Sequence, residues 1–255
     1  MKTTKEKIEE IQTNGYNIDF ANVFNHAFEN YKKIALYAGL MIFVFAILFG
    51  FLAGGIVILT FGVSALNQKM LENVTAENFT GLHLAIYLIV GILFNCLFVP
   101  FSAGLIKMAD SAEKDEEFHV STVFQYYKNP YFQELVIATF LITIFSTGLS
   151  EMFKLVGVEI IGALFSAAIS FFTFLTIPLI IFGNLKAIEA LKSSIIIVVK
   201  QPLVLLGLLI VSGIASLVGF IGCCIGVFFT IPFLYSMYYA IYTSIIGIDS
   251  ENGFE

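Results

Sequence analysis

The chain contains no arginine, so lysine supplies all 13 of its basic residues. Arginine is the side chain suited to bidentate binding of phosphate and carboxylate groups, and its absence excludes an arginine clamp for a lipid headgroup. The formal net charge is -6, and basic clusters are few. We therefore expect no nucleic-acid partner.

Charged residues of either sign are scarce, at 13% of the chain, against about 25% in average soluble proteins. Long uncharged runs account for the deficit, and 58% of all residues are hydrophobic. A helix that crosses about 30 Å of hydrocarbon needs about 20 apolar residues. The sequence thus predicts an all-α polytopic membrane protein with six transmembrane helices. The six segments are 34–66, 81–108, 131–150, 155–182, 202–220 and 221–246.

Residues suited to catalysis or metal binding are equally few. The three cysteines and three histidines have neither the spacing of a zinc site nor that of a disulfide framework. The sequence contains no nucleophile elbow and no phosphate-binding glycine loop with its lysine. We therefore expect no enzyme activity, no cofactor, and no catalytic, cofactor-binding or metal-binding residue.

Lysine placement predicts the orientation, because cationic residues in short loops stay on the cytoplasmic side. Eleven of the 13 lysines precede the first segment, lie between segments two and three or four and five, or, as Lys107 does, lie at the end of segment two on the same side. Only Lys69 and Lys154 fall on the opposite face. Both termini are thus assigned to the cytoplasm.

A weak threefold repeat divides a membrane domain, residues 18–247, into hairpin units 18–110, 111–183 and 184–247. A polar segment, 1–17, precedes this domain, and a short tail, 248–255, follows it. Each unit consists of an amphipathic helix, a lysine pivot where the chain enters the bilayer, and a membrane hairpin. The pivots are Lys32 and Lys33 in the first unit, Lys128 in the second and Lys200 in the third.

The amphipathic helices carry large apolar side chains at helical spacing, as at Phe20, Phe24 and Phe28 in the first unit and Ile188 and Ile195 in the third. We expect these helices to lie in the headgroup region with the apolar face toward the hydrocarbon. The alternative is that they pack on one another as a cytoplasmic cap.

Each returning helix contains one proline, at Pro100, Pro178 or Pro232. Proline lacks a backbone N–H and clashes with the preceding turn, so we expect a kink in each returning helix. The tyrosines that follow Pro232 predict an aromatic anchor at the membrane interface, with a ligand groove as the alternative.

Polar residues within the predicted spans are the remaining candidates for a site. Asn95 lies five positions before Pro100, where its amide can bond to a neighbouring helix. Glu159 begins the fourth span, and the helix dipole favours a carboxylate in a first turn. We expect structural roles for both residues, with a polar membrane site as the alternative.

Residues 184–247 contain short motifs that match those of a known group of membrane proteins. The motifs are Ser193-Ser194, Lys200-Gln201-Pro202, the glycine-rich turn 219–226 and Thr230-Ile231-Pro232. The segment resembles the glycerophosphoryl diester phosphodiesterase membrane-domain family and related uncharacterised bacterial polytopic membrane proteins. The resemblance covers about a quarter of the chain and includes no phosphodiesterase domain. It implies a domain of the bacterial cytoplasmic (inner) membrane without phosphodiesterase activity.

Two functions are consistent with these features. The first is a non-enzymatic membrane protein that scaffolds or regulates partners or organises lipid; its partners would be the phospholipid bilayer, other membrane proteins or copies of itself. The second is a transporter or channel for a lipidic or small uncharged substrate, with a path between the kinked returning helices. The repeated prolines favour it, and the lack of charge midway along the spans argues against ion coupling. A cavity lined by Asn95, serines and threonines would favour the transporter, whereas an exposed apolar groove would favour the scaffold.

Overall fold

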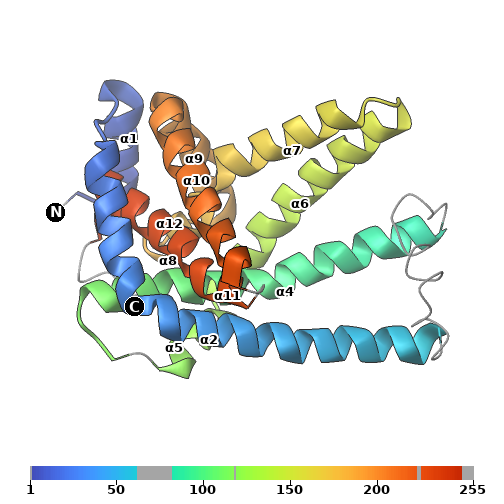
Figure 1. Cartoon of the computed structure of the whole chain (residues 1–255). Helices are drawn as coiled ribbons and strands as arrows, with labels where there is room; N and C mark the ends of the chain where they lie inside the picture. Colours follow the sequence, from blue (N-terminus) through green and yellow to red (C-terminus); the bar gives the residue numbers. More distant parts are fainter. Residues whose placement is uncertain (1, 62–81, 118, 223–224, 249–255) are drawn as a thin grey trace.

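The computed structural model describes residues 2–61, 82–117, 119–222 and 225–248. Every regular element in these ranges is helical, and the helices form diverging arms (Figure 1). The elements are α1 (Thr4–Asn14), α2 (Phe20–Phe61), α4 (Leu82–Glu113), α5 (Val120–Phe124), η3 (Gln125–Tyr127), α6 (Tyr131–Leu155), α7 (Glu159–Thr173), α8 (Thr176–Ile181), α9 (Ala187–Lys200), α10 (Pro202–Leu217), η4 (Val218–Gly222), α11 (Gly226–Thr230) and α12 (Pro232–Ile245).

Five helical segments of the described chain are long and apolar enough to cross a membrane. They are Phe20–Leu52, Leu88–Glu113, Tyr131–Leu155, Glu159–Ile181 and Pro202–Ile221. Large apolar side chains on these segments face outward, such as Phe51, which is 79% exposed, and Leu203, which is 82% exposed. Soluble monomers rarely expose apolar surface on this scale. The chain is therefore an all-helical protein with several segments that suit a membrane.

The sixth predicted segment, 221–246, is not one continuous helix. Its residues are divided between α11 and α12, and the interruption falls at Ile231, directly before Pro232. Proline has no N–H to continue the helical hydrogen bonds, which explains the position of the break. The 14 residues of α12 extend about 21 Å, less than the thickness of the hydrocarbon core. Six continuous spanning helices are thus not confirmed.

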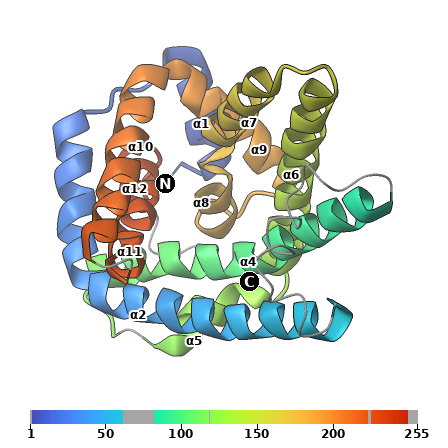
Figure 2. The same cartoon turned by 45° about the vertical axis from the view of Figure 1, so that its right-hand side comes forward.

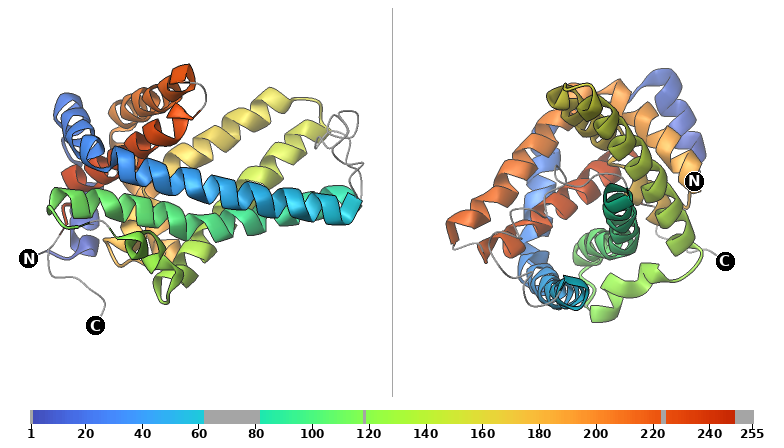
Figure 3. Two further views of the ribbon diagram at one scale, coloured as in Figure 1. Left: turned by 60° about the horizontal axis from the view of Figure 1, so that its bottom comes forward. Right: turned by 90° about the vertical axis from the view of Figure 1, so that its right-hand side faces the viewer.

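The long helices pair as neighbours in sequence. The helix α2 packs along α4, and α6 packs along α7, so that two arms extend from a common base (Figure 1; Figure 3, left). A third, shorter pairing joins α10 to η4 and α11. Here Gly219 lies against Gly226, and a Cβ atom on either glycine would approach the other residue's backbone within 2.5 Å. The two small residues allow this close turn.

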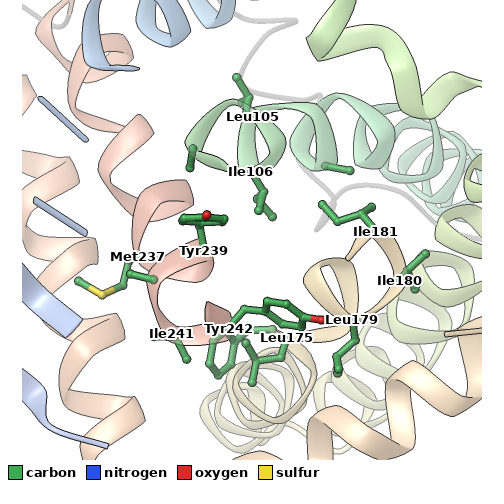
Figure 4. Close-up of a cluster of buried hydrophobic side chains, with 14 of the residues drawn as sticks. Leu105, Ile106, Leu175, Leu179, Ile180, Ile181, Met237, Tyr239, Ile241 and Tyr242 are labelled. Carbon is green, nitrogen blue, oxygen red and sulfur yellow. The ribbon is translucent and has the colours of Figure 1, made fainter. Parts of the chain in front are cut away.

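The hydrophobic core forms where the segments that follow the three prolines meet. Figure 2 shows α8 in the middle of the molecule, with α4, α6 and α12 around it. Figure 4 shows side chains from α4, α8 and α12 gathered around a common centre. Those with no more than 1% exposure include Leu105, Ile106, Leu179, Ile180, Met237 and Ile241. The proline-containing segments therefore build the base from which the arms extend.

Two of the tyrosines after Pro232 belong to this core. Tyr239 is 2% exposed and Tyr242 is 1% exposed (Figure 4). The expectation of an interfacial aromatic anchor is therefore wrong for these two residues. Their rings pack against Phe182 of the neighbouring chain segment, at centroid distances of 5.8 and 5.5 Å.

The predicted pivot of the first unit does not end a helix. The helix α2 continues through Lys32 and Lys33 without interruption, although its course bends between its beginning and its end (Figure 1). In the second unit η3 ends directly before Lys128, and in the third unit α9 ends at Lys200. The prediction of an entry point thus coincides with helix ends in two units, whereas the first unit uses one bent helix.

The amphipathic segments leave some of their large apolar residues outside. In α2, Val23 and Ala27 are buried, whereas Phe20 and Phe28 are exposed. In α9, Ala190, Ile197 and Val198 are buried, while Ile188 and Ile195 are exposed. Each helix therefore packs on the base through one face and presents further large apolar side chains outward.

In each proline-containing segment, a backbone carbonyl also accepts a hydrogen bond from a side-chain hydroxyl of the helical segment that begins the next repeat unit. These bonds join Tyr127 to the carbonyl of Leu97 at 2.8 Å, Ser194 to that of Phe172 at 2.8 Å, and Tyr31 to that of Phe229 at 3.1 Å. The last bond runs from the first unit back to the third. The three contacts thus close a ring, and the right view of Figure 3 looks along the molecule at this closed arrangement.

Candidate functional site

A cavity of about 400 Å³ lies between α6, α7 and α8. Asn95 of α4 and Tyr238 of α12 complete its wall. Its hydroxyl groups come from Thr139, Thr143, Ser146, Thr147, Ser170, Thr173, Thr176 and Tyr238, and its apolar wall includes Leu135, Ile142, Phe174, Ile177 and Ile180. No charged side chain is among the described residues that line it. Its volume is within the range of small-molecule sites.

Several polar side chains of the cavity bond back to their own helix. The hydroxyl of Thr173 donates to the carbonyl of Ile169 at 2.7 Å, and that of Thr147 donates to the carbonyl of Thr143. Such bonds to a carbonyl one turn earlier are common for serine and threonine in apolar helices. They use the hydroxyl proton and leave the oxygen lone pairs free to accept.

Thr176 differs from these residues because its hydroxyl has no partner. The residue is 1% exposed, and its Oγ1 atom accepts and donates no hydrogen bond within the described structure. A buried hydroxyl without a partner is destabilising by about 1–3 kcal/mol. An unsatisfied polar atom in the wall of a cavity indicates a place where a ligand can bond.

Thr176 lies directly after the helix interruption that precedes Pro178. The helix α7 ends at Thr173, and Thr176 begins α8. The carbonyl one turn before Thr176 belongs to Phe172, and its described partner is Ser194, which donates to it at 2.8 Å. The proline therefore interrupts the helix at the position where the cavity forms.

Asn95 lines the cavity. Its observed hydrogen bond differs from the one that its position in the sequence predicted. Its Nδ2 atom donates to the carbonyl of Gly91, one turn earlier in the same helix, at 2.9 Å. The bond that is observed for Asn95 thus lies within its own helix, and its proposed contact with a neighbouring helix stays a prediction. Glu159 lies elsewhere: it is exposed and is the first residue of α7.

The three prolines have different effects on their helices. Pro100 lies inside α4, which continues past it to Glu113. Pro178 lies inside α8, after the interruption at residues 174–175, and Pro232 is the first residue of α12. The expected distortion is therefore an interruption of the helix in the second and third units, where Phe174, Leu175 and Ile231 still have right-handed helical backbone angles, and not in the first.

The pivot lysines contact protein groups at the base of the molecule. Lys32 pairs with Glu29, and Lys33 bonds to Asp115 at 2.7 Å and to the carbonyl of Ala112 at 2.9 Å. Lys200 donates to the carbonyl of Gln12 at 2.6 Å. Lys128 is exposed at the end of η3. The structure does not bring these lysines to the cavity.

A buried ionic cluster at the end of α4 was not predicted. The carboxylate of Asp110, which is fully buried, pairs with Lys107 and with Lys114, the latter at 3.0 Å. It also accepts from the hydroxyl of Tyr239 at 3.2 Å. The i+3 and i+4 spacing of a carboxylate and lysines was the available signal. We place this cluster in the base as a structural element, because the lysines and Tyr239 satisfy the buried carboxylate of Asp110.

Histidine and cysteine take structural roles where the structure describes them. The Nε2 atom of His26 lies 2.7 Å from a carboxylate oxygen of Glu113, and Cys96 is buried beside the carbonyl of Val136. The described residues contain no group of three or more metal-binding side chains. Cys223 and Cys224 lie outside the described residues.

A comparison with protein-family models, with curated proteins and with solved structures finds no match to this chain. The resemblance of residues 184–247 to a phosphodiesterase membrane domain stays a prediction from sequence.

Proposed function

We propose that this chain is a non-enzymatic membrane protein that binds a small uncharged solute in the hydroxyl-lined cavity and carries it across the membrane. The observation that supports this most directly is the unpartnered hydroxyl of Thr176 in a cavity that has no charged wall. Charge is expensive inside a membrane, so a neutral solute suits such a site. The cavity combines the serines and threonines that this function requires with Asn95.

The proposed topology is three hairpins with six crossings, each hairpin preceded by an amphipathic helix at the interface, and with both termini in the cytoplasm of a bacterial inner membrane. Support comes from the lysine distribution and the large apolar side chains outside α2 and α9. In this topology α11 and α12 together supply the sixth crossing. A cysteine at Lys5 would react only from the cytoplasm, and one at Val156 only from outside. Labelling of the Lys5→Cys protein in intact cells by an impermeant reagent would overturn this orientation.

Transport can be measured with purified protein in liposomes. Neutral solutes such as glycerol and urea would be applied in an osmotic jump, and vesicle volume would be followed by light scattering. The variant Thr143→Phe fills the cavity, whereas Ile144→Phe adds the same ring to an exposed position of the same helix. We expect faster entry of at least one solute with the wild type and Ile144→Phe, and not with Thr143→Phe. Equal rates in protein-containing and empty liposomes for all neutral solutes would refute the transport function.

A second candidate function is the organisation of lipid, in which the protein binds acyl chains of the bilayer. An apolar groove of about 750 Å³ runs between α2 and α4, lined by side chains that include Phe45, Phe49, Phe94 and Phe98. Rings cover its floor, with the centroids of Phe45 and Phe101 4.3 Å apart. A groove of this composition suits one acyl chain better than a polar partner.

This second candidate predicts capture of a phospholipid that carries a photoreactive acyl chain. Gly50 lines the groove and has no neighbouring atom within 4 Å of an added Cβ, so Gly50→Phe can fill the groove. Gly148 on α6 is equally open but lies outside the groove, and Gly148→Phe is the control. Crosslinking to α2 and α4 that is lost in Gly50→Phe alone would support acyl-chain binding, and equal crosslinking in all three proteins would exclude it.

A further inference from the structure

We propose that the cavity selects a neutral solute that donates hydrogen bonds through N–H groups and has an apolar body, as a primary carboxamide does. This inference rests on the proposed function and names the chemical class of its ligand. The three observations that carry it are the hydrogen bonds already made by the wall, the absence of charge, and the two rings at one end of the cavity.

The polar wall offers more acceptors than donors. A serine or threonine hydroxyl has one proton and two lone pairs. Thr147 and Thr173 have already given their protons to carbonyls of their own helices, and Asn95 has given one of its amide protons to Gly91. The hydroxyls of Ser146 and Ser166 bond to each other, which uses one more proton. The oxygen lone pairs of these groups remain available, so a ligand rich in donors complements them.

Thr176 is the position where a primary carboxamide gains most. Its hydroxyl is buried and unpartnered, so its lone pairs are available to a ligand N–H and its proton to a ligand carbonyl. A ligand N–H that reaches this oxygen therefore relieves an existing cost instead of replacing a good bond.

The charge and the apolar wall define the rest of the ligand. A cation would also satisfy acceptors, but no described side chain of the wall carries a negative charge to offset its dehydration. The rings of Phe174 and Tyr238 lie 5.5 Å apart and are tilted by 42° at one side of the cavity. Ile142 and Ile177 extend this apolar wall. A neutral amide attached to an apolar or aromatic body fits both surfaces.

Benzamide and N,N-dimethylbenzamide test the inference directly. Both are neutral and aromatic, but only benzamide has N–H donors. Binding to the purified full chain would be detected as a ligand-dependent rise in the melting temperature of the wild type or variant, relative to the same protein without ligand. The affinity would be measured by titration of the protein with ligand. We expect wild type to bind benzamide at least tenfold more tightly than the dimethyl compound, which corresponds to about one hydrogen bond.

Two variants assign this preference to the cavity. Thr176→Val keeps the side-chain shape and removes the hydroxyl, and we expect it to lower benzamide affinity about tenfold. Thr243→Val makes the same change in α12 outside the cavity, where the hydroxyl bonds to the carbonyl of Tyr239 at 3.1 Å, and we expect it to keep wild-type affinity. Equal binding of both amides by the wild type, or undiminished benzamide binding by Thr176→Val, would overturn the inference.

The liposome experiment separates this inference from the proposed function. If Thr143→Phe abolishes entry of a neutral solute while the two amides bind equally, then the transport function stands and the N–H class is wrong. If no neutral solute enters the protein-containing liposomes faster than empty ones, and Thr176→Val binds both amides as tightly as the wild type does, then both proposals are wrong.

Discussion

The hydroxyl of Tyr31 donates to the carbonyl oxygen of Phe229 at 3.1 Å, and this bond joins the first repeat unit to the third. The ring of Tyr31 also meets Phe233 edge to face, at a centroid distance of 5.4 Å. Phe229 lies in the last turn of α11, where carbonyls lack helical partners. The bond therefore satisfies a backbone group at the helix break and closes the ring of three units.

Replacement of Tyr31 by phenylalanine isolates this bond, because the ring contact with Phe233 is kept. We expect Tyr31→Phe to lower the free energy of unfolding by about 1 kcal/mol, the usual net value of one hydrogen bond. Ser194→Ala removes the equivalent bond at a fully buried side chain, and we expect a loss at least as large. Denaturant unfolding of the protein in detergent measures both changes, and wild-type stability in both variants would show that the ring of hydroxyl bonds is not stabilising.

Asp110→Asn tests the buried ionic cluster. The variant removes the charged acceptor from Lys107 and Lys114. Because these lysine side chains are 24% and 37% exposed and can reach water, we expect a loss of about 1.5–3 kcal/mol, the usual value of a hydrogen bond to a charged group. The matched control is Asp115→Asn, since Asp115 pairs with Lys33 but its side chain is 83% exposed. We expect a change within about 0.5 kcal/mol for this control. Similar unfolding curves for the two variants would contradict the role assigned to Asp110.

The sequence predicted the helical class and most of the spans, because long uncharged runs depend only on local composition. It placed Lys107 at the end of the second span and Lys114 in the loop after it. In the structure α4 continues to Glu113, so Lys107 and Asp110 lie within the helix and Lys114 follows directly after it. The neutralisation of Asp110 by two lysines and Tyr239 depends on contacts that hydropathy does not record. The prolines were found, but whether a proline breaks or only interrupts the bonds of a helix depends on the packing around it.

The sequence did not predict that a cavity exists; it indicated only that a cavity lined by Asn95, serines and threonines would favour a transporter. Serine and threonine in α6 and α7 look unremarkable in a hydrophobic run, because each hydroxyl can bond to its own helix. What distinguishes Thr176 is that Ser194, from another repeat unit, bonds to the carbonyl of Phe172 one turn earlier. That relationship is tertiary, so no spacing rule within residues 159–181 could have identified the residue.

The contact between α1 and α9 predicts a pH-dependent stability. Glu189 accepts from Lys5 at 3.0 Å, and this hydrogen bond lowers the pKa of the Glu189 carboxyl below its ordinary value of 4.5. A lowered pKa in the folded state means that the contribution is present above pH 4.5 and is lost as the pH falls through the folded value. We expect amide exchange in α1 to accelerate as the pH is lowered through this range, after correction for the intrinsic rate. Glu189→Gln should remove that dependence, whereas Glu10→Gln, whose partner Lys2 lies beside the same helix, should keep it.

Thr176→Val is expected to make the ligand-free protein more stable while it weakens ligand binding. The hydroxyl of Thr176 is buried without a partner, so its replacement by a methyl group removes a desolvation cost of about 1 kcal/mol or more. Thr173→Val is the matched control, because the hydroxyl of Thr173 bonds to Ile169 and its loss is expected to be neutral or destabilising. Thermal unfolding without ligand measures both changes. Under the proposed function this cost is retained because the hydroxyl binds the solute, and a lower stability of Thr176→Val than of Thr173→Val would show that the hydroxyl serves packing instead.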